Sequence, residues 1–277
     1  MDYTYPSIGL KLMSLKNFQD RDFANNVICK INEYGKEFMP QKFDMYEPLK
    51  RKYDPNDISA VIDAWMEDEM NREVSKNEFA EGLLLMKSKS KSKASYMISW
   101  RKENIIHFNG FFFSVNIEYV KNENNFNKFL NLCKELVCLI EPVYGKIVNE
   151  SIPGAFEPID LEIRHPELHW MNFFGKPYID LFGRDKLLSA PAYKVESIGD
   201  KVIAIQTTNN IFEPIPNDVR EKIKRHLGEN AFVWDGKQAL AYRNKENLVP
   251  EFDFSEVLFD KTKPIIEPQI RTRQVQK

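Results

Sequence analysis

Segment 165–169 (HPELH) is the one place where residue types and spacing fit a metal site. Two histidines four residues apart on a helix can chelate a metal ion, and here Glu167 lies between His165 and His169. Pro166 permits a helix only if the helix starts there, which leaves His165 outside the first turn. Packing is therefore the favoured interpretation. A metal-dependent hydrolase that uses His165, Glu167 and His169 stays as the alternative.

Other catalytic signatures are missing from the sequence. It contains no GxGxxG, GxxxxGK[ST], GxSxG, HExxH or CxxC pattern. The three cysteines, Cys29, Cys133 and Cys138, lie in apolar patterns and cannot all pair with one another, which favours reduced, buried thiols in a reducing cytosol. We therefore expect a protein that is not an enzyme and that needs no cofactor and no metal.

The segment from Asp54 to Glu81 is strongly acidic. It has nine acids and two bases, a local balance of 2 − 9 = −7. A solvated helix face explains this pattern, and so does a contact surface for a basic partner, where opposite charge speeds encounter. The candidate partner-binding residues are Trp65, Glu67, Asp68, Glu69 and Glu73.

Trp65 has two interpretations within this surface. Hot spots of protein interfaces favour Trp, so the side chain could anchor a partner. If Trp65 instead shares the apolar face of its helix with Ile58 and Ile62, it belongs to the core, and only the acids remain as contacts.

Composition limits the function classes further. The chain of 277 residues is 43% hydrophobic and 29% charged, with 39 Lys and Arg against 41 Asp and Glu. A net charge of −2 does not fit a protein that binds nucleic acid through bulk charge. No apolar run approaches the ~18 residues of a membrane span, and the first ten residues lack a basic region typical of secretion signals. We expect a cytoplasmic protein with no membrane or direct nucleic-acid partner.

The first half of the chain has sequence patterns typical of both strands and helices. Residues 8–15 alternate as a strand does, and residues 22–35 have helical spacing. An irregular, proline-containing stretch (38–55) and a helix up to Met66 follow. Strands are predicted at 82–86, 94–100 and 105–119, with the Lys/Ser run 87–93 as an exposed turn between the first two. A long amphipathic helix begins near Asn122.

The second half starts after a Pro/Gly-containing linker at 151–158. It predicts a short helix that ends at Gly183, a strand at 201–207, a helix at 216–227 and a hairpin around Asp235-Gly236. Trp170, Phe173 and Phe174 are expected to be core residues.

This order of elements indicates an α+β fold in which helices pack on an antiparallel sheet. One compact unit and two related lobes both fit the pattern. The corresponding division is an N-terminal lobe at 1–150, a C-terminal lobe at 151–260 packed on the first, and a basic tail at 261–277.

Segments 170–175 (WMNFFG) and 178–183 (YIDLFG) carry a family resemblance. Together with the strand at 201–207 and the helix at 216–227, they resemble bacterial immunity proteins of polymorphic toxin and type VI secretion systems, close to the immunity protein 52 family. The strand at 96–100, followed by Phe108-Asn109-Gly110, is similar to an aromatic strand pair of that family.

The resemblance implies a cytoplasmic, non-enzymatic protein that binds and blocks a cognate toxin. It identifies neither the toxin nor the oligomeric state. The acids between Asp54 and Glu81 would suit a nuclease toxin, whose active surface must be basic to hold phosphates.

Overall fold

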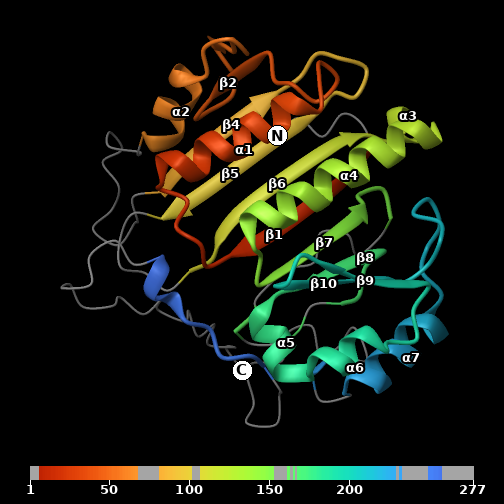
Figure 1. Cartoon of the computed structure of the whole chain (residues 1–277). Helices are drawn as coiled ribbons and strands as arrows, with labels where there is room; N and C mark the ends of the chain where they lie inside the picture. Colours follow the sequence, from red (N-terminus) through yellow and green to blue (C-terminus); the bar gives the residue numbers. More distant parts are fainter. Residues whose placement is uncertain are drawn as a thin grey trace, which may run out of the picture.

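A single ten-stranded sheet runs through the computed structural model (Figure 1). The structure describes residues 6–67, 81–101, 107–152, 161–162, 165, 167–228, 231–232 and 249–257. The strand order is β3-β2-β4-β5-β6-β1-β7-β8-β10-β9, and every pair of neighbours is antiparallel. The strands are β1 (Ser7–Ser14), β2 (Lys42–Asp44), β3 (Arg51–Lys52), β4 (Glu81–Lys87), β5 (Ser95–Arg101), β6 (Asn109–Asn116), β7 (Tyr144–Asn149), β8 (Met171–Phe174), β9 (Lys194–Ile198) and β10 (Val202–Gln206).

Helices α1 (Arg21–Glu33), α2 (Ser59–Met66) and α4 (Glu123–Ile140) lie with the β2-to-β1 half of the sheet. Strands there alternate between buried and partly exposed residues, because side chains on successive residues point to opposite faces. Leu10 of β1 lies opposite Phe113 of β6, which stacks on Tyr96 of β5 with ring centroids 4.7 Å apart. These side chains and the apolar stripes of α1 and α4 form one hydrophobic core.

The β7-to-β9 half of the sheet has a second core on its other face. Helices α5 (Lys176–Phe182), α6 (Arg184–Leu188) and α7 (Asn217–Leu227) lie on that side (Figure 1). Ile203 and Ile205 of β10 belong to this second core, whereas Val202 and Ala204 face the first. Strands β7 and β8 are consequently buried at every residue.

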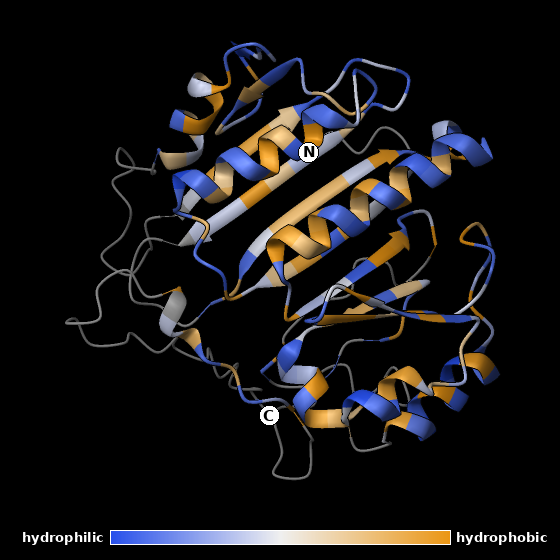
Figure 2. Ribbon diagram, viewed as in Figure 1, coloured by the Kyte–Doolittle hydropathy of each residue, from blue (hydrophilic) through white to orange (hydrophobic). Residues whose placement is uncertain are grey.

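The distribution of hydropathy follows this arrangement (Figure 2). Helices α1 and α4 alternate hydrophobic and hydrophilic stretches along their length, as expected when one face packs on a sheet. Within the described part of the chain, no helix is long and apolar enough to cross a membrane.

The predicted α+β class is confirmed: helices pack on an antiparallel sheet. Strand β7 pairs with both β1 and β8, so the sheet continues across the predicted lobe boundary near residue 150. The division into lobes stays a prediction. The basic tail at 261–277 and most of the predicted hairpin lie outside the described residues, as do residues 153–158 of the linker.

Two sequence expectations need correction. The predicted strand at 105–119 ends at Asn116, whose side chain accepts a hydrogen bond from the Glu118 amide and starts the short helix α3 (Ile117–Val120). Of the three cysteines only Cys133 is fully buried; Cys138 is exposed, because it lies on the solvent side of α4.

Gly82 of β4 leaves space for an aromatic ring. It lies directly opposite Trp100 of β5, and an added Cβ would come within 1.9 Å of the Trp100 ring. The indole nitrogen of Trp100 donates a 3.0 Å hydrogen bond to the carbonyl of Trp65, so the ring is fixed and cannot move aside easily.

We predict that Gly82→Ala lowers the free energy of unfolding by about 1–3 kcal/mol, the usual cost of overpacking a core. Chemical denaturation of the wild type and the variant measures the difference. Ser99→Ala, on the neighbouring strand, serves as the control and should cost less. Equal stability of Gly82→Ala and the wild type would contradict the fixed position of the Trp100 ring.

Candidate functional site

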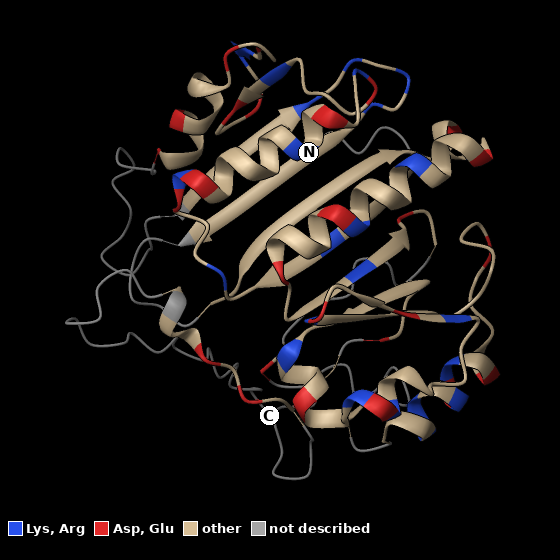
Figure 3. Ribbon diagram, viewed as in Figure 1, with Lys and Arg blue, Asp and Glu red and all other residues tan. Residues whose placement is uncertain are grey.

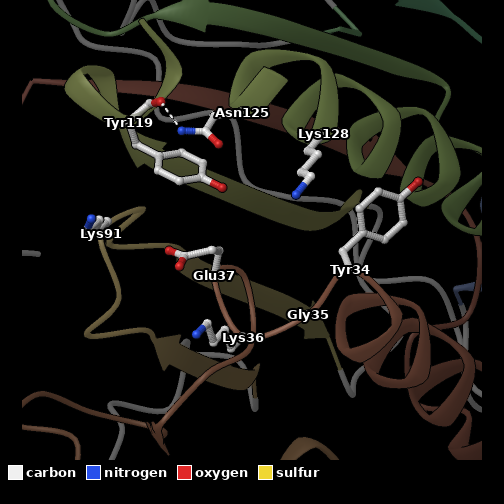
Figure 4. A pocket seen from close by; sticks show the side chains of 8 residues that line it. All are labelled: Tyr34, Gly35, Lys36, Glu37, Lys91, Tyr119, Asn125 and Lys128. Carbon is white, nitrogen blue, oxygen red and sulfur yellow. Dashed lines mark hydrogen bonds between the residues drawn. The ribbon is translucent and has the colours of Figure 1, made fainter. Parts of the chain in front are cut away.

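A hollow of about 480 Å³ opens between the end of α1, the β4–β5 turn, α3 and the start of α4 (Figure 4). Every lining residue except Gly35 has a polar side chain, and three of them are lysines. The lining residues are Tyr34, Gly35, Lys36, Glu37, Lys91, Tyr119, Asn125 and Lys128.

The first wall of the hollow is a turn after α1. Gly35 adopts a φ of +84°, a left-handed conformation that favours glycine, and the chain reverses there. Phe38 then anchors the turn: its side chain is fully buried, with ring centroids 6.0 Å from Phe113 and 5.9 Å from Tyr119. Lys36 and Glu37 are thus held between a fixed turn and a fixed aromatic anchor.

The second wall is the Lys/Ser turn between β4 and β5. Its serines point inward: Ser92 is fully buried, and both Ser90 and Ser92 donate hydrogen bonds to the carbonyl of Glu37. Because the residues alternate, Lys89, Lys91 and Lys93 are exposed on the outer side. The turn was predicted to be exposed, and the structure corrects this for its serines.

The third wall comes from α3 and α4. The side-chain amide of Asn125 donates a 3.0 Å hydrogen bond to the carbonyl of Tyr119, which ties the two helices together. Lys128 follows one turn later on α4, and its ammonium group points toward the space between Tyr34 and Tyr119 (Figure 4).

Charge in the hollow is unbalanced. Three lysines against Glu37 leave a net charge of 3 − 1 = +2. Lys36, Lys91 and Lys128 are exposed, and no described residue forms a hydrogen bond or ion pair with any of them. Figure 3 shows basic residues on the β4–β5 turn and on α4.

Glu37 and the two tyrosines complete the electrostatics. Oxygen Oε2 of Glu37 is buried and finds no hydrogen-bond donor among the described residues. Burial, and then the charge of Glu37, raise the pKa of Tyr119. Burial also raises the pKa of Tyr34, with Glu135 as the next cause. Both hydroxyls therefore stay protonated at neutral pH and can donate hydrogen bonds.

Trp65 does not lie on a partner surface. Its side chain is fully buried, its ring packs edge-on against Phe23, and its indole nitrogen donates a 3.0 Å hydrogen bond to the carbonyl of Phe18. Val61 and Ile62 of the same helix are buried too. The apolar face of α2 takes the indole into the core, so of the two interpretations of Trp65 the core position holds and the surface anchor does not.

For the acids near Trp65, contact with a partner stays a prediction. Glu67 is exposed and accepts two 2.8 Å hydrogen bonds from the guanidinium of Arg51. Asp68, Glu69 and Glu73 lie outside the described residues. Glu67 and the lysine-lined hollow are at opposite ends of α1, because α2 lies by the start of that helix and the hollow by its end.

The three residues of the metal hypothesis do not converge. The ring of His165 lies among aromatic side chains, 4.7 Å from Phe232 and 5.4 Å from Phe174, whereas Glu167 pairs with Lys224 at 2.7 Å. Among the described residues of this segment, His165 and 167–169, none is helical. The described residues contain no group of three or more His, Cys, Asp or Glu that could hold a metal ion.

His169 instead accompanies a buried lysine. Nε2 of His169 lies 2.8 Å from Nζ of Lys146, whose side chain is 1% exposed. Burial, and then the charge of Lys146, lower the pKa of His169 from 6.5 to about 2. The imidazole is therefore neutral in the folded protein and accepts a hydrogen bond from the ammonium group.

Sequence reasoning missed the hollow. Residues 36, 91 and 128 are far apart in the chain, and only the fold brings them together. The alternation of Ser and Lys at 87–93 was a usable signal, because a period of two places the serines on one side and the lysines on the other.

We predict that the stability of the protein falls by about 2 kcal/mol between pH 7 and pH 5 because of His169. Below pH 6.5 the unfolded chain protonates this histidine, whereas the folded protein excludes the proton until a pH near 2. His169→Gln keeps a hydrogen-bond acceptor for Lys146 but cannot titrate, so its loss over the same pH window should be smaller. Urea titrations at several pH values measure the free energy of unfolding of the wild type and of the variant. If both fall equally between pH 7 and pH 5, His169 is not the neutral, buried group described here.

Comparison with known proteins shows a shared fold. No protein family matches the chain, and no curated protein matches it. Among solved structures, a Pseudomonas aeruginosa T6SS protein (PA0821) is similar, with a TM-score of 0.55 and 13% sequence identity. The similarity covers 80% of this chain and 73% of that protein.

Proposed function

We propose that this chain is an immunity protein that binds and neutralises a cognate bacterial toxin in the cytoplasm of the producing cell. The observation that carries the proposal is the fold shared with a T6SS protein over 80% of the chain. The resemblance of segments 170–175 and 178–183 to immunity proteins supports it independently, because it rests on residues rather than on backbone geometry.

A binding protein of this kind acts by occlusion. Its requirement is a rigid scaffold that presents charged groups to the partner, because complementary charge speeds encounter and suppresses wrong partners. Two charged features of the described residues lie at opposite ends of α1: Glu67 and the lysine-lined hollow. A nuclease toxin, whose active surface is basic, would suit the acids.

The experiment that tests the function is a protection assay. The toxin candidate is the protein encoded next to this chain in its genome. It is expressed from an inducible promoter in a bacterial host with or without the chain. The proposal predicts that growth stops with the toxin alone and recovers with the chain, and that the two proteins co-purify. Growth arrest that the chain does not relieve, or relief without a stable complex, would overturn the proposal.

The acidic surface gives a kinetic prediction. A variant with Glu67→Gln, Asp68→Asn and Glu69→Gln should associate with the toxin more slowly at low salt and depend less on salt, because rim charges act mainly on encounter. Stopped-flow association rates at low and high salt measure this. Asp218→Asn, a single exposed change on α7, is the control. Rates that match those of the wild type at both salt concentrations would remove these acids from the interface.

A further inference from the structure

We infer that the lysine-lined hollow is a docking site for an acidic segment of a protein partner. The inference relies on the proposed function only for the identity of that partner, the toxin. Its physical basis is the convergence of Lys36, Lys91 and Lys128 from three separate elements on one hollow.

The absence of counterions distinguishes these lysines from their neighbours. Lys30 on α1 pairs with Glu33 at 2.7 Å, and Lys134 on α4 pairs with Glu196 at 2.6 Å. Lys36 follows α1, Lys128 lies on α4 and Lys91 lies on the β4–β5 turn, yet within the described ranges no acid forms an ion pair with any of the three. Carboxylates supplied from outside would complete the charge balance.

The form of the hollow favours a protruding segment over a small molecule. Small-molecule sites are mainly apolar and enclose most of the ligand. Here the three lysines are exposed at the rim, and the remaining lining is two tyrosines, Asn125, Gly35 and Glu37. A protein loop can enter such an opening while the rest of the partner stays outside.

The hollow is also held in shape before a partner arrives. Ser90 and Ser92 fix the β4–β5 turn to the carbonyl of Glu37, and Asn125 fixes α4 to Tyr119. An acidic segment would therefore meet donors that are already in place, which lowers the entropic cost of binding.

Glu37 makes the hollow selective. Its charge repels any anion, and its buried Oε2 lacks a donor among the described residues. An acidic peptide can spread several carboxylates over the three lysines and so offset the repulsion, whereas a phosphate ion is a single small anion. The hollow should thus prefer an acidic peptide to phosphate.

The test uses the whole protein and a capped hexaglutamate peptide as the probe. Reductive ¹³C-methylation keeps each lysine charged and makes it visible by NMR. We expect saturable shifts of a few lysine signals with hexaglutamate, and none with a capped hexalysine peptide.

The double variant Lys36→Gln, Lys128→Gln should lose those signals and bind hexaglutamate at least about fivefold more weakly. The control variant Lys52→Gln, Lys222→Gln removes two exposed lysines elsewhere and should bind as the wild type does.

Glu37→Gln provides a second readout. It removes the repulsion between Glu37 and bound anions, so the affinity for phosphate should rise more than the affinity for hexaglutamate. The ratio of the two affinities should therefore become smaller. Non-saturable shifts, equal affinity of the wild type for phosphate and peptide, or equal weakening in the hollow and control variants would each overturn the inference.

Repeating the comparison with the toxin separates the two proposals. If the wild type neutralises the toxin and the hollow variant binds it as tightly as the control variant does, the docking inference is wrong and the immunity function stands. If hexaglutamate binding depends on the hollow but no toxin is neutralised, the immunity function is wrong and the acidic-segment site stands.

Discussion

The structure depends on the position of β1 in the middle of the sheet. This first strand pairs with β6 on one side and with β7 on the other, so it joins strands that lie more than 90 residues further along the chain. Its even-numbered residues, Ile8, Leu10 and Leu12, are fully buried in the first core. Loss of this strand would separate the two halves of the sheet and divide that core.

The way the helices cover the sheet determines where the candidate site forms. The β2-to-β1 half has a core on one face, and the β7-to-β9 half has a core on both faces. Helices α1 and α4 lie side by side across the first face and contact each other. At one end of this pair, the turn after α1 meets α3, the start of α4 and the β4–β5 turn, and the lysine-lined hollow forms there. The hollow is therefore a product of helix packing on the sheet, and none of its walls belongs to a catalytic motif.

The sequence predicted the parts of the fold that are buried on one side. Residues 8–15 alternate clearly and form β1, and the apolar stripe after Asn122 forms α4. Strands β7 and β8 were missed because they are buried on both faces and do not alternate. They also contain Lys146 and Asn172, buried polar residues that form hydrogen bonds with His169.

Long-range pairing likewise explains the errors at the candidate sites. For Trp65 the sequence left a surface anchor and a core position open; the core position holds, and the long-range hydrogen bonds with Phe18 and Trp100 decide between them. The metal hypothesis for His165, Glu167 and His169 assumed a shared helical face, but none of these three residues is helical and each side chain has a different partner. Hydrogen–deuterium exchange of the chain, alone and in complex with its toxin, tests the account most directly. Protection of residues 35–38, 89–93 and 119–128 is predicted, whereas a stable complex that protects only α5, α6 and α7 would contradict it.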